Sequence, residues 1–189
     1  GTKDALFGEV EALEQVEQAL LNIAKLYGYA GIRTPIFEHT ELFTRSVGDS
    51  SDIVRKEMYT FTDKGDRSLT LRPELTAGVI RSVVEQKVVH SYDLPLKLYY
   101  LGPAFRYERP QLGRLRQFHQ FGVENIGITS PLSVAETIAT GVTVLEMLGF
   151  QGVSVSLNSL GDEASRNAYK TALKAYYEPQ LNDVLYALR

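Results

Sequence analysis

Cysteine is absent from the sequence, and so is any long apolar run. Without cysteine the chain has no disulfide framework, no thiolate nucleophile and no cysteine-containing zinc site. No apolar stretch approaches the roughly 20 residues that span a bilayer. The first residues, Gly1 to Asp4, lack the charged-then-apolar order of a signal peptide. These absences predict a soluble cytoplasmic protein that makes no contact with a membrane.

The size and charge of the chain narrow its class further. With 189 residues, of which 44% are hydrophobic and 23% charged, the chain is long enough to bury one substantial core, so one domain is expected. A net charge of −3 and a pI near 5.7 give no general attraction to a polyanion. Any contact with phosphate must therefore come from a local concentration of arginine or lysine.

Hydrophobic periodicity and turn residues predict a mixture of helices and strands. Helices are predicted over about residues 8–27, from Pro73 to before His90, from Ser130 to Gly149 and from Asp162 toward Tyr177. Strands are predicted over 29–34, 58–61, 68–71, 96–101, 104–107, 117–126 and 153–157. Residues 45–53 are predicted to form a loop, either near the site or simply on the surface. The order favours an α+β fold with a largely antiparallel sheet flanked by helices.

The densest chemical signal is a group of arginines between two predicted strands. Four arginines fall within the eleven residues 106–116, around a loop turned by Pro110 and Gly113. The planar guanidinium of arginine suits bidentate recognition of phosphate. This strand–loop–strand therefore predicts a binding site for a nucleoside triphosphate.

Strand alternation adds groups that suit an amino acid and a base. Arg106 and Glu108 are predicted to share one face of their strand, and one face of the next strand is predicted to carry Phe118, Gln120, Gly122 and Glu124. Together these would offer cations for phosphate, an aromatic plane, and carboxylate and amide groups for an ammonium. Spacing alone equally allows a solvated hairpin in which Arg and Glu pair across the strands.

The histidines do not add a metal site to this picture. His39, His90 and His119 have no spacing typical of a metal triad, and no metal site is predicted. Alternation places His119 on the face opposite Gln120.

Several segments resemble class II aminoacyl-tRNA synthetases. Phe-Arg-Tyr-Glu at 105–108, followed by Arg114 and Phe118, resembles motif 2 of that class, and Arg-Thr-Pro-Ile-Phe-Glu at 33–38 resembles the end of motif 1. The histidyl branch is indicated by Arg-Gln-Phe-His-Gln-Phe-Gly-Val-Glu at 116–124, Leu-Thr-Leu-Arg-Pro-Glu at 69–74, Val-Gly-Asp at 47–49, Lys-Glu-Met-Tyr-Thr-Phe at 56–61 and Asn-Ser-Leu-Gly-Asp at 158–162. The resemblance covers nearly the whole chain in collinear order.

The resemblance implies a role for each matching side chain. For ATP, it implies that Arg106 binds the α-phosphate and stabilises the transition state, Glu108 reads the adenine edge, Phe118 stacks on the ring and Arg114 holds the distal phosphates. For histidine, it implies a pocket formed by Glu74, Thr76, Gln120 and Glu124. The implied reaction is attack of the histidine carboxylate on the α-phosphorus of Mg-ATP, followed by transfer to tRNA(His). A homodimer through the motif 1 region around Pro35 is implied as well.

The sequence also departs from the pattern of the family. Leu75 stands between Glu74 and Thr76, where the family usually has glycine, so it either narrows the amino-acid pocket or points into the core. The Arg-Gly-Leu-Asp-Tyr-Tyr segment, motif 3 and the anticodon-binding domain do not occur in this chain. Residues 1–189 are therefore expected to be a partial catalytic domain with motifs 1 and 2, and with little complete activity alone.

Two other functions compete with this interpretation. The regulatory subunit of ATP phosphoribosyltransferase resembles the same family but does not aminoacylate tRNA. Retention of Arg106, Glu108, Gln120 and Glu124 argues against it, since such a subunit has no need for the whole set. A nucleic-acid-binding module without catalysis is disfavoured by the acidic balance.

Overall fold

The computed structural model describes residues 1–47, 53–159 and 161–180, and its contacts divide the chain into two units, Gly1–Val153 and Ser154–Arg189. The first unit contains two sheets of three strands each, with the orders β1-β5-β6 and β2-β4-β3. Within the described ranges, no helix combines the length and apolar character needed to cross a membrane.

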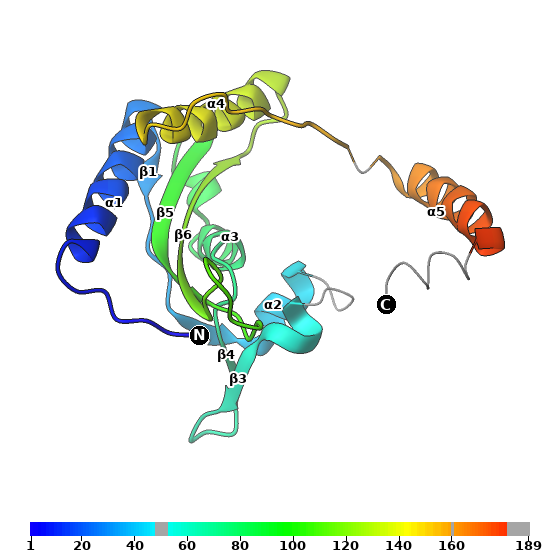
Figure 1. The fold of residues 1–189 in the computed structure, drawn as a ribbon, viewed down its shortest axis with the longest axis horizontal. Helices are drawn as coiled ribbons and strands as arrows, with labels where there is room; N and C mark the ends of the chain where they lie inside the picture. Colours follow the sequence, from blue (N-terminus) through cyan, green and yellow to red (C-terminus); the bar gives the residue numbers. More distant parts are fainter. Residues whose placement is uncertain (48–52, 160, 181–189) are drawn as a thin grey trace. The chain divides into compact units, whose positions relative to one another are not determined.

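The larger sheet is built on two long antiparallel strands, β5 (Leu96–Phe105) and β6 (Gln117–Ile126). Their register pairs Leu96 with Ile126 at one end and Phe105 with Gln117 at the other. The short strand β1 (Ala30–Gly31) pairs in parallel with the other edge of β5. Figure 1 shows β5 and β6 as the long curved pair that runs through the middle of this unit.

The core lies where helix α3 (Thr76–Glu85) packs on one face of this sheet. The buried side chains of the core are Leu75, Val79 and Val83 from the helix segment, and Leu96, Tyr100 and Ala104 from β5. The three β5 residues have even numbers and so point to the same face. Fully burying each such aliphatic side chain contributes roughly 1.5–3 kcal/mol, so the helix is fixed on this face mainly by apolar burial.

Two further helices cover the first unit. Helix α1 (Glu9–Leu26) contacts helix α4 (Pro131–Met147), and a hydrogen bond of 2.9 Å joins Tyr27 Oη to Thr143 Oγ1. Ser130 caps α4 by accepting the amide of Leu132, and Pro131 follows at the first helical turn, as predicted.

The smaller sheet is antiparallel and contains β2 (Phe37–His39), β3 (Tyr59–Thr62) and β4 (Ser68–Leu71). The predicted hairpin is confirmed as β3–β4. Asp63 shapes its turn by accepting the amides of Gly65 and Arg67, and the hydrogen bond from the Arg67 side chain holds the pKa of Asp63 at about 2. Helix α2 (Thr40–Val47) follows β2, and a π-helix (Ile53–Glu57) precedes β3.

Arg72 joins the two sheets. It follows β4 directly, it is only 6% exposed, and its guanidinium donates to three backbone carbonyls. Nη1 donates to Thr34 at 2.9 Å and to Pro35 at 3.3 Å, while Nε donates to Pro103 of β5 at 2.7 Å. Burial lowers the pKa of Arg72, so the carbonyl dipoles and the nearby Glu38 must stabilise its charge in place of water.

Strand β5 differs from the prediction of two strands broken near Gly102 and Pro103. The carbonyl of Pro103 accepts from Arg72, so this residue directs its backbone toward Arg72 and away from β6. The missing N–H of proline therefore removes no hydrogen bond between β5 and β6, and the strand continues through it.

Three other predicted segments were wrong in extent or type. Residues 153–157 form no strand, and Val155 and Leu157 are exposed, since the described chain offers them no pairing partner. The strand predicted over 29–34 is reduced to the two residues of β1, which pair only with Leu98 and Tyr99. Of the loop predicted over 45–53, residues 45–47 belong to α2, Ile53 begins the π-helix, and 48–52 lie outside the described residues.

The second unit contains helix α5 (Glu163–Tyr177), which confirms the final predicted helix. Asp162 caps it, because its carboxylate accepts the amide of Ser165 at 2.7 Å. A single turn of 3₁₀ helix, Glu178–Gln180, follows.

Replacement of Arg72 by alanine should lower the free energy of unfolding by about 3 kcal/mol or more, because three carbonyls lose their donor in a buried position. Urea unfolding followed by circular dichroism measures the change. The matched control is Arg67→Ala, which removes an exposed arginine from an ion pair with Asp63 and should shift the midpoint little. Equal midpoints for the two variants would contradict the role of Arg72.

Candidate active site

The candidate site lies where the start of α3 meets the face of β5 and β6 that the helix covers. Tyr100 of β5 lies opposite Gly122 of β6 in the register. Its hydroxyl is 3.2 Å from Thr76 Oγ1 and 3.4 Å from Glu124 Oε1. A Cβ atom added to Gly122 would overlap the Tyr100 ring, so the glycine provides the space in which the ring lies.

Two carboxylates face this end of the site. Glu74 accepts the amide of Ala77 at 2.9 Å and so caps the start of α3. Glu124 is half-buried, and burial raises its pKa. The negative charge of Glu74 raises this pKa further, whereas hydrogen bonds from Thr76 and Tyr100 lower it. The site thus holds a carboxylate that an ammonium or an imidazole N–H would stabilise.

Gln120 lies on the same face of β6, two residues along the strand from Gly122. Its Oε1 atom is buried and has no hydrogen-bond partner within the described residues. A buried amide oxygen without a donor is costly, and such an atom is typical of a site that a ligand completes.

Leu75 does not narrow this pocket. It is 2% exposed and belongs to the core with Val79 and Tyr100. Of the two possibilities left open by the sequence, the structure shows the one in which the leucine points into the core.

At the other end of β6, Arg106 and Phe118 lie together. Arg106 directly follows β5, and its Nε donates to the carbonyl of Pro73 at 2.8 Å. The guanidinium carbon lies 5.2 Å from the centre of the Phe118 ring. The guanidinium of Arg106 is therefore held through Nε by a backbone carbonyl and packed on an aromatic ring. Its planar shape and charge suit an anion.

Glu108 lies between two arginines. Its carboxylate is 4.0 Å from Nη1 of Arg106 and 2.9 Å from Nε of Arg114, although the angle of the second contact does not make it a hydrogen bond. The backbone bends here, since the amide of Glu108 donates to the carbonyl of Arg106. Arg106 and Glu108 thus approach through a turn, not through the strand alternation that was predicted.

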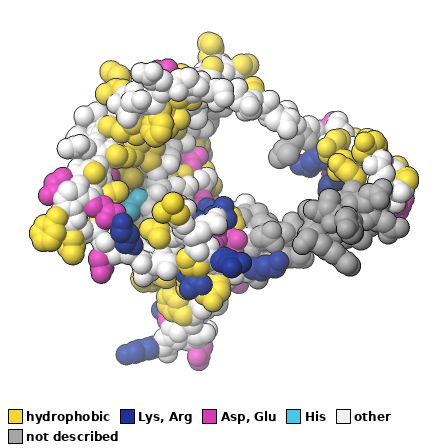
Figure 2. Space-filling model, in the orientation of Figure 1, with side chains coloured by type: hydrophobic (Ala, Val, Ile, Leu, Met, Phe, Trp, Pro, Cys, Tyr) yellow, Lys and Arg dark blue, Asp and Glu magenta, His cyan; other side chains and the backbone are white. Residues whose placement is uncertain are grey.

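The visible surface of the first unit carries charged side chains of both signs (Figure 2). On the face that Figure 2 shows, Lys and Arg side chains are intermixed with Asp and Glu side chains. In the β5–β6 loop, the carboxylate of Glu108 partly neutralises the charge of Arg114. The arrangement suits recognition of a small phosphorylated ligand better than the coating of a long polyanion.

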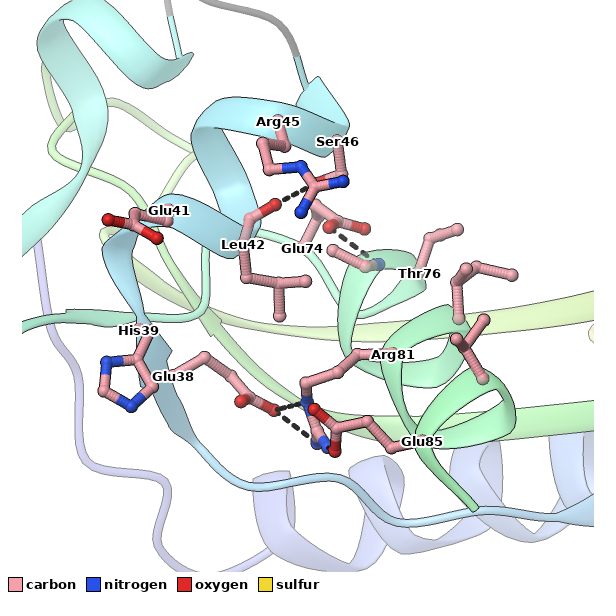
Figure 3. Close-up of a pocket in the computed structure, with 13 residues that line it drawn as sticks. Glu38, His39, Glu41, Leu42, Arg45, Ser46, Glu74, Thr76, Arg81 and Glu85 are labelled. Atoms are coloured by element: carbon pink, nitrogen blue, oxygen red, sulfur yellow. Dashed lines mark hydrogen bonds and ion pairs between the residues drawn. The ribbon is translucent and has the colours of Figure 1, made fainter. Parts of the chain in front are cut away.

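A groove of about 850 Å³ opens beside Glu74 and Thr76, between α2 and α3. Glu74 and Thr76 line it, together with the apolar side chains Leu42 and Ile80. Figure 3 shows Arg81 of α3 between the carboxylates of Glu38 and Glu85, to which it pairs at 2.7 Å in each case. These ion pairs keep the wall of the groove polar while its floor remains apolar.

His119 lies apart from this site, as predicted. It lines a separate cavity of about 540 Å³ with Arg33 and Tyr99, on the opposite face of the sheet from Gln120. Over the residues that the structure covers, no group of three or more His, Cys, Asp and Glu side chains could hold a metal ion.

All eight predicted site residues are on or beside one face of β5 and β6. One group, Glu74, Thr76 and Glu124, lies around Tyr100. In the other group Arg106 contacts Phe118, and Glu108 lies near both Arg106 and Arg114. Gln120 lies between the two groups along β6. Tyr100 was missed, because its position depends on the register between two strands. The signal that could have found it is Gly122, a glycine inside a predicted strand, which indicates a close approach.

Comparison with known proteins agrees with this geometry. Apo histidyl-tRNA synthetase of S. aureus has a similar fold, with a TM-score of 0.75 and 42% identity over 96% of this chain and 42% of that chain. A structure described as an ATP phosphoribosyltransferase regulatory subunit/histidyl-tRNA synthetase from Bacillus halodurans C has a TM-score of 0.67 and 28% identity, over 79% of this chain and 37% of that chain. The α+β fold is thus that of a class II aminoacyl-tRNA synthetase catalytic domain.

The sequence comparisons are more specific. A family model described as Histidyl-tRNA synthetase matches residues 1–185. The histidine–tRNA ligase of Bacillus cytotoxicus is 55% identical over 183 residues, which is 97% of this chain and 43% of that protein. The chain therefore belongs to the histidyl-tRNA synthetase family, and it spans less than half the length of the curated relatives it matches.

Replacement of Glu124 by glutamine should stabilise the fold at neutral pH. Because folding raises the pKa of Glu124, the stability of the parent falls as the pH rises from the unfolded pKa of this group through its folded pKa. The variant does not lose this stability. The difference in free energy of unfolding between the variant and the parent should therefore widen as the pH rises over that range and shrink at lower pH. Urea midpoints measured across pH test it, with Glu146→Gln, an exposed glutamate of α4, as the control. A gap that does not change with pH would contradict the burial of a costly carboxylate.

Proposed function

We propose that this chain provides the histidine- and ATP-binding part of a histidine–tRNA ligase. In that function the site activates histidine with Mg-ATP to histidyl-adenylate and pyrophosphate, and the histidyl group then passes to tRNA(His) in the cytoplasm. The observation that carries the proposal is the shared face of β6, where Phe118, the unpartnered Gln120 and the half-buried Glu124 follow one another in alternate positions.

At the amino-acid end, the chemistry of the side chains matches histidine. The substrate has a positively charged α-ammonium and an imidazole N–H, all of which are donors. Among the described residues Gln120 Oε1 has no donor, and the carboxylates of Glu74 and Glu124 are close enough for the charge of Glu74 to raise the pKa of Glu124. A cationic ligand would satisfy the amide oxygen and relieve the repulsion between the carboxylates.

At the nucleotide end, Arg106 is the group suited to the α-phosphate. An oxygen of the histidine carboxylate attacks the α-phosphorus, the bond from that phosphorus to the bridging oxygen breaks, and pyrophosphate leaves with the electron pair. The substrate brings its own nucleophile, so the protein contributes position and positive charge. Phe118, already packed against Arg106, would stack on the adenine.

Glu108 and Arg114 must separate for ATP to bind in this way. In the structure they pair with each other, and this pairing keeps a largely buried carboxylate from being isolated. In the proposed complex, Arg114 moves to the distal phosphates and Glu108 accepts from the amino group of adenine. Arg114 is 60% exposed, so its side chain has room to make this exchange.

The Mg²⁺ ion of Mg-ATP is expected to bind mainly through the phosphates. The described part of the chain has no group of three carboxylates or histidines that could form a protein cage for it. Magnesium commonly keeps substrate phosphates and water as ligands, so the residues present are compatible with it. When bound, the ion would neutralise charge on the phosphates.

The proposal includes the organisation of the longer enzyme. We assign residues 1–189 to a partial class II catalytic domain with motifs 1 and 2, and the 43% coverage of the Bacillus cytotoxicus protein supports this. Complete aminoacylation is then expected to require the remaining length that such relatives have.

A homodimer through the motif 1 region is also part of the proposal. Around Pro35, three apolar side chains are exposed: Ile36 at 45%, Phe37 at 53% and Phe61 at 44%. Phe37 and Phe61 pack edge to face, with ring centres 6.5 Å apart, so they present one apolar surface. A second copy of the chain would bury it.

A regulatory subunit of ATP phosphoribosyltransferase is the second candidate. The similarity to the Bacillus halodurans structure favours it, because the description of that structure includes this function. The complete set of histidine- and ATP-binding side chains on one face supports the ligase instead.

The replacement Arg106→Ala should reduce ATP–pyrophosphate exchange with histidine by roughly 100-fold or more, about 3 kcal/mol, because it removes a preorganised donor to the developing charge. Exchange is measured with each of the twenty amino acids, beside a calorimetric titration of Mg-ATP. Arg109→Ala, at an exposed position in the same loop, is the control and should retain exchange.

Each outcome of the exchange experiment has a distinct meaning. Exchange with histidine alone that is lost in Arg106→Ala supports the ligase. Binding of Mg-ATP and histidine without exchange supports the two pockets and assigns the chemical step to the longer protein. A folded chain that binds neither ligand would contradict the proposal and favour the regulatory subunit.

The replacement Ile36→Asp should convert a dimer to a monomer, since it places a charge in the apolar surface around Pro35. Sedimentation velocity over a range of concentrations measures the change. Leu132→Asp, at an exposed apolar position on α4, is the control. A parent chain that is monomeric at every concentration would contradict the assignment of this surface to a dimer.

A further inference from the structure

Tyr100 is a buried side chain at the proposed amino-acid end, and the proposed function assigns no role to its hydroxyl. The residue is 5% exposed, and its ring packs in the core with Leu75 and Val79. Its hydroxyl nevertheless extends beyond the apolar core, over the position where Gly122 has no side chain. A phenol in such a place needs hydrogen-bond partners, because burial of an unpaired hydroxyl is costly.

The hydroxyl has partners on two different elements. Thr76 Oγ1, in the first turn of α3, lies 3.2 Å away, and Glu124 Oε1, on β6, lies 3.4 Å away. The phenol has one proton, and the carboxylate can only accept, so the proton is donated to Glu124. The threonine hydroxyl also has one proton, which it donates either to the phenol oxygen or to the carboxylate of Glu124. Tyr100 of β5 thus links the helix and the strand that carry the two sides of the proposed histidine pocket.

We propose that Tyr100 is a positioning residue for histidine: its hydroxyl fixes the carboxylate of Glu124 and the hydroxyl of Thr76 in the orientation that receives the amino acid. This inference rests on the proposed function of the pocket. The contact occupies Oε1 of Glu124 and leaves the second carboxylate oxygen for a donor of the ligand. Gly122 is required because any larger residue would displace the ring from beneath the carboxylate.

The charges around Glu124 predict a pH signature for this role. The groups that face it are Glu74 before α3, Thr76 on α3 and Tyr100 on β5. Burial and Glu74 raise the pKa of Glu124, and the hydrogen bonds from Thr76 and Tyr100 lower it. Loss of the Tyr100 hydroxyl removes one of the two stabilising bonds, so the pKa of Glu124 must rise further.

The test is the replacement Tyr100→Phe, which keeps the ring in the core and removes only the hydroxyl. Histidine affinity should fall about tenfold at neutral pH, the size expected for loss of a hydrogen bond to a charged group. Affinity for Mg-ATP should not change. Since binding needs the ionised carboxylate, the loss of histidine affinity on acidification should begin at higher pH in the variant. Calorimetric titrations across pH measure all three.

The control is Tyr99→Phe, the neighbouring tyrosine of β5 on the opposite face, which lines the cavity near His119. It should leave histidine affinity and its pH dependence unchanged. A second readout needs no ligand, because the side-chain carboxyl ¹³C signal of Glu124 reports its titration midpoint directly. This midpoint should rise in Tyr100→Phe and not in Tyr99→Phe.

The two readouts separate this inference from the proposed function. If the parent binds histidine and Tyr100→Phe matches it in affinity and in the titration of Glu124, the positioning role is overturned. If the parent does not bind histidine, the proposed function fails, and the role of Tyr100 toward histidine fails with it. The carboxyl titration then still decides whether Tyr100 holds Glu124.

Discussion

The structure depends most on the buried guanidinium of Arg72. Its side chain holds the segment of Thr34 and Pro35 to β5, and its backbone amide and carbonyl bond to Ile36 and Phe105. One residue therefore ties together the end of the motif 1 segment, the small sheet and the last residue of β5. The carbonyl of the next residue, Pro73, holds Arg106. The proposed α-phosphate ligand is thus fixed to the same short segment that fixes the sheets to each other.

The candidate site lowers the free energy of unfolding, whereas the hydrogen bonds of Arg72 raise it. Glu124 is half-buried near a second carboxylate, and Gln120 has a buried oxygen without a hydrogen-bond donor among the described residues. Each of these arrangements is unfavourable in the absence of a ligand. Natural proteins accept such local costs where function requires them, so the position of these groups on one face is itself informative.

The sequence was sufficient for the features that depend on local patterns. Helix α1, the β3–β4 hairpin and strand β6 follow from periodicity and turn residues, and the facing of Phe118, Gln120 and Glu124 follows from alternation along one strand. The resemblance to a known family gave the eight candidate site residues, whose role spacing alone left open and which remain a prediction. Local patterns did not predict contacts between distant segments. Examples are the hydrogen bond from Arg72 to the carbonyl of Pro103 and the hydrogen bond from Tyr100 to Glu124. These depend on strand register, which a single sequence does not specify.

Strand β6 sets the distance between the two proposed substrate-binding ends of the site. Phe118, proposed to contact the nucleotide, and Glu124, proposed to contact the amino acid, are six positions apart on β6. A strand advances about 3.4 Å per residue, so their Cα atoms are separated by roughly 20 Å. In the proposed complex, the distance between the adenine and the amino acid would be set by the separation of these two residues. Deletion of one residue between them would shorten this distance and also turn one of the two side chains to the wrong face. The spacing of this segment is consequently as constrained as the identity of its residues.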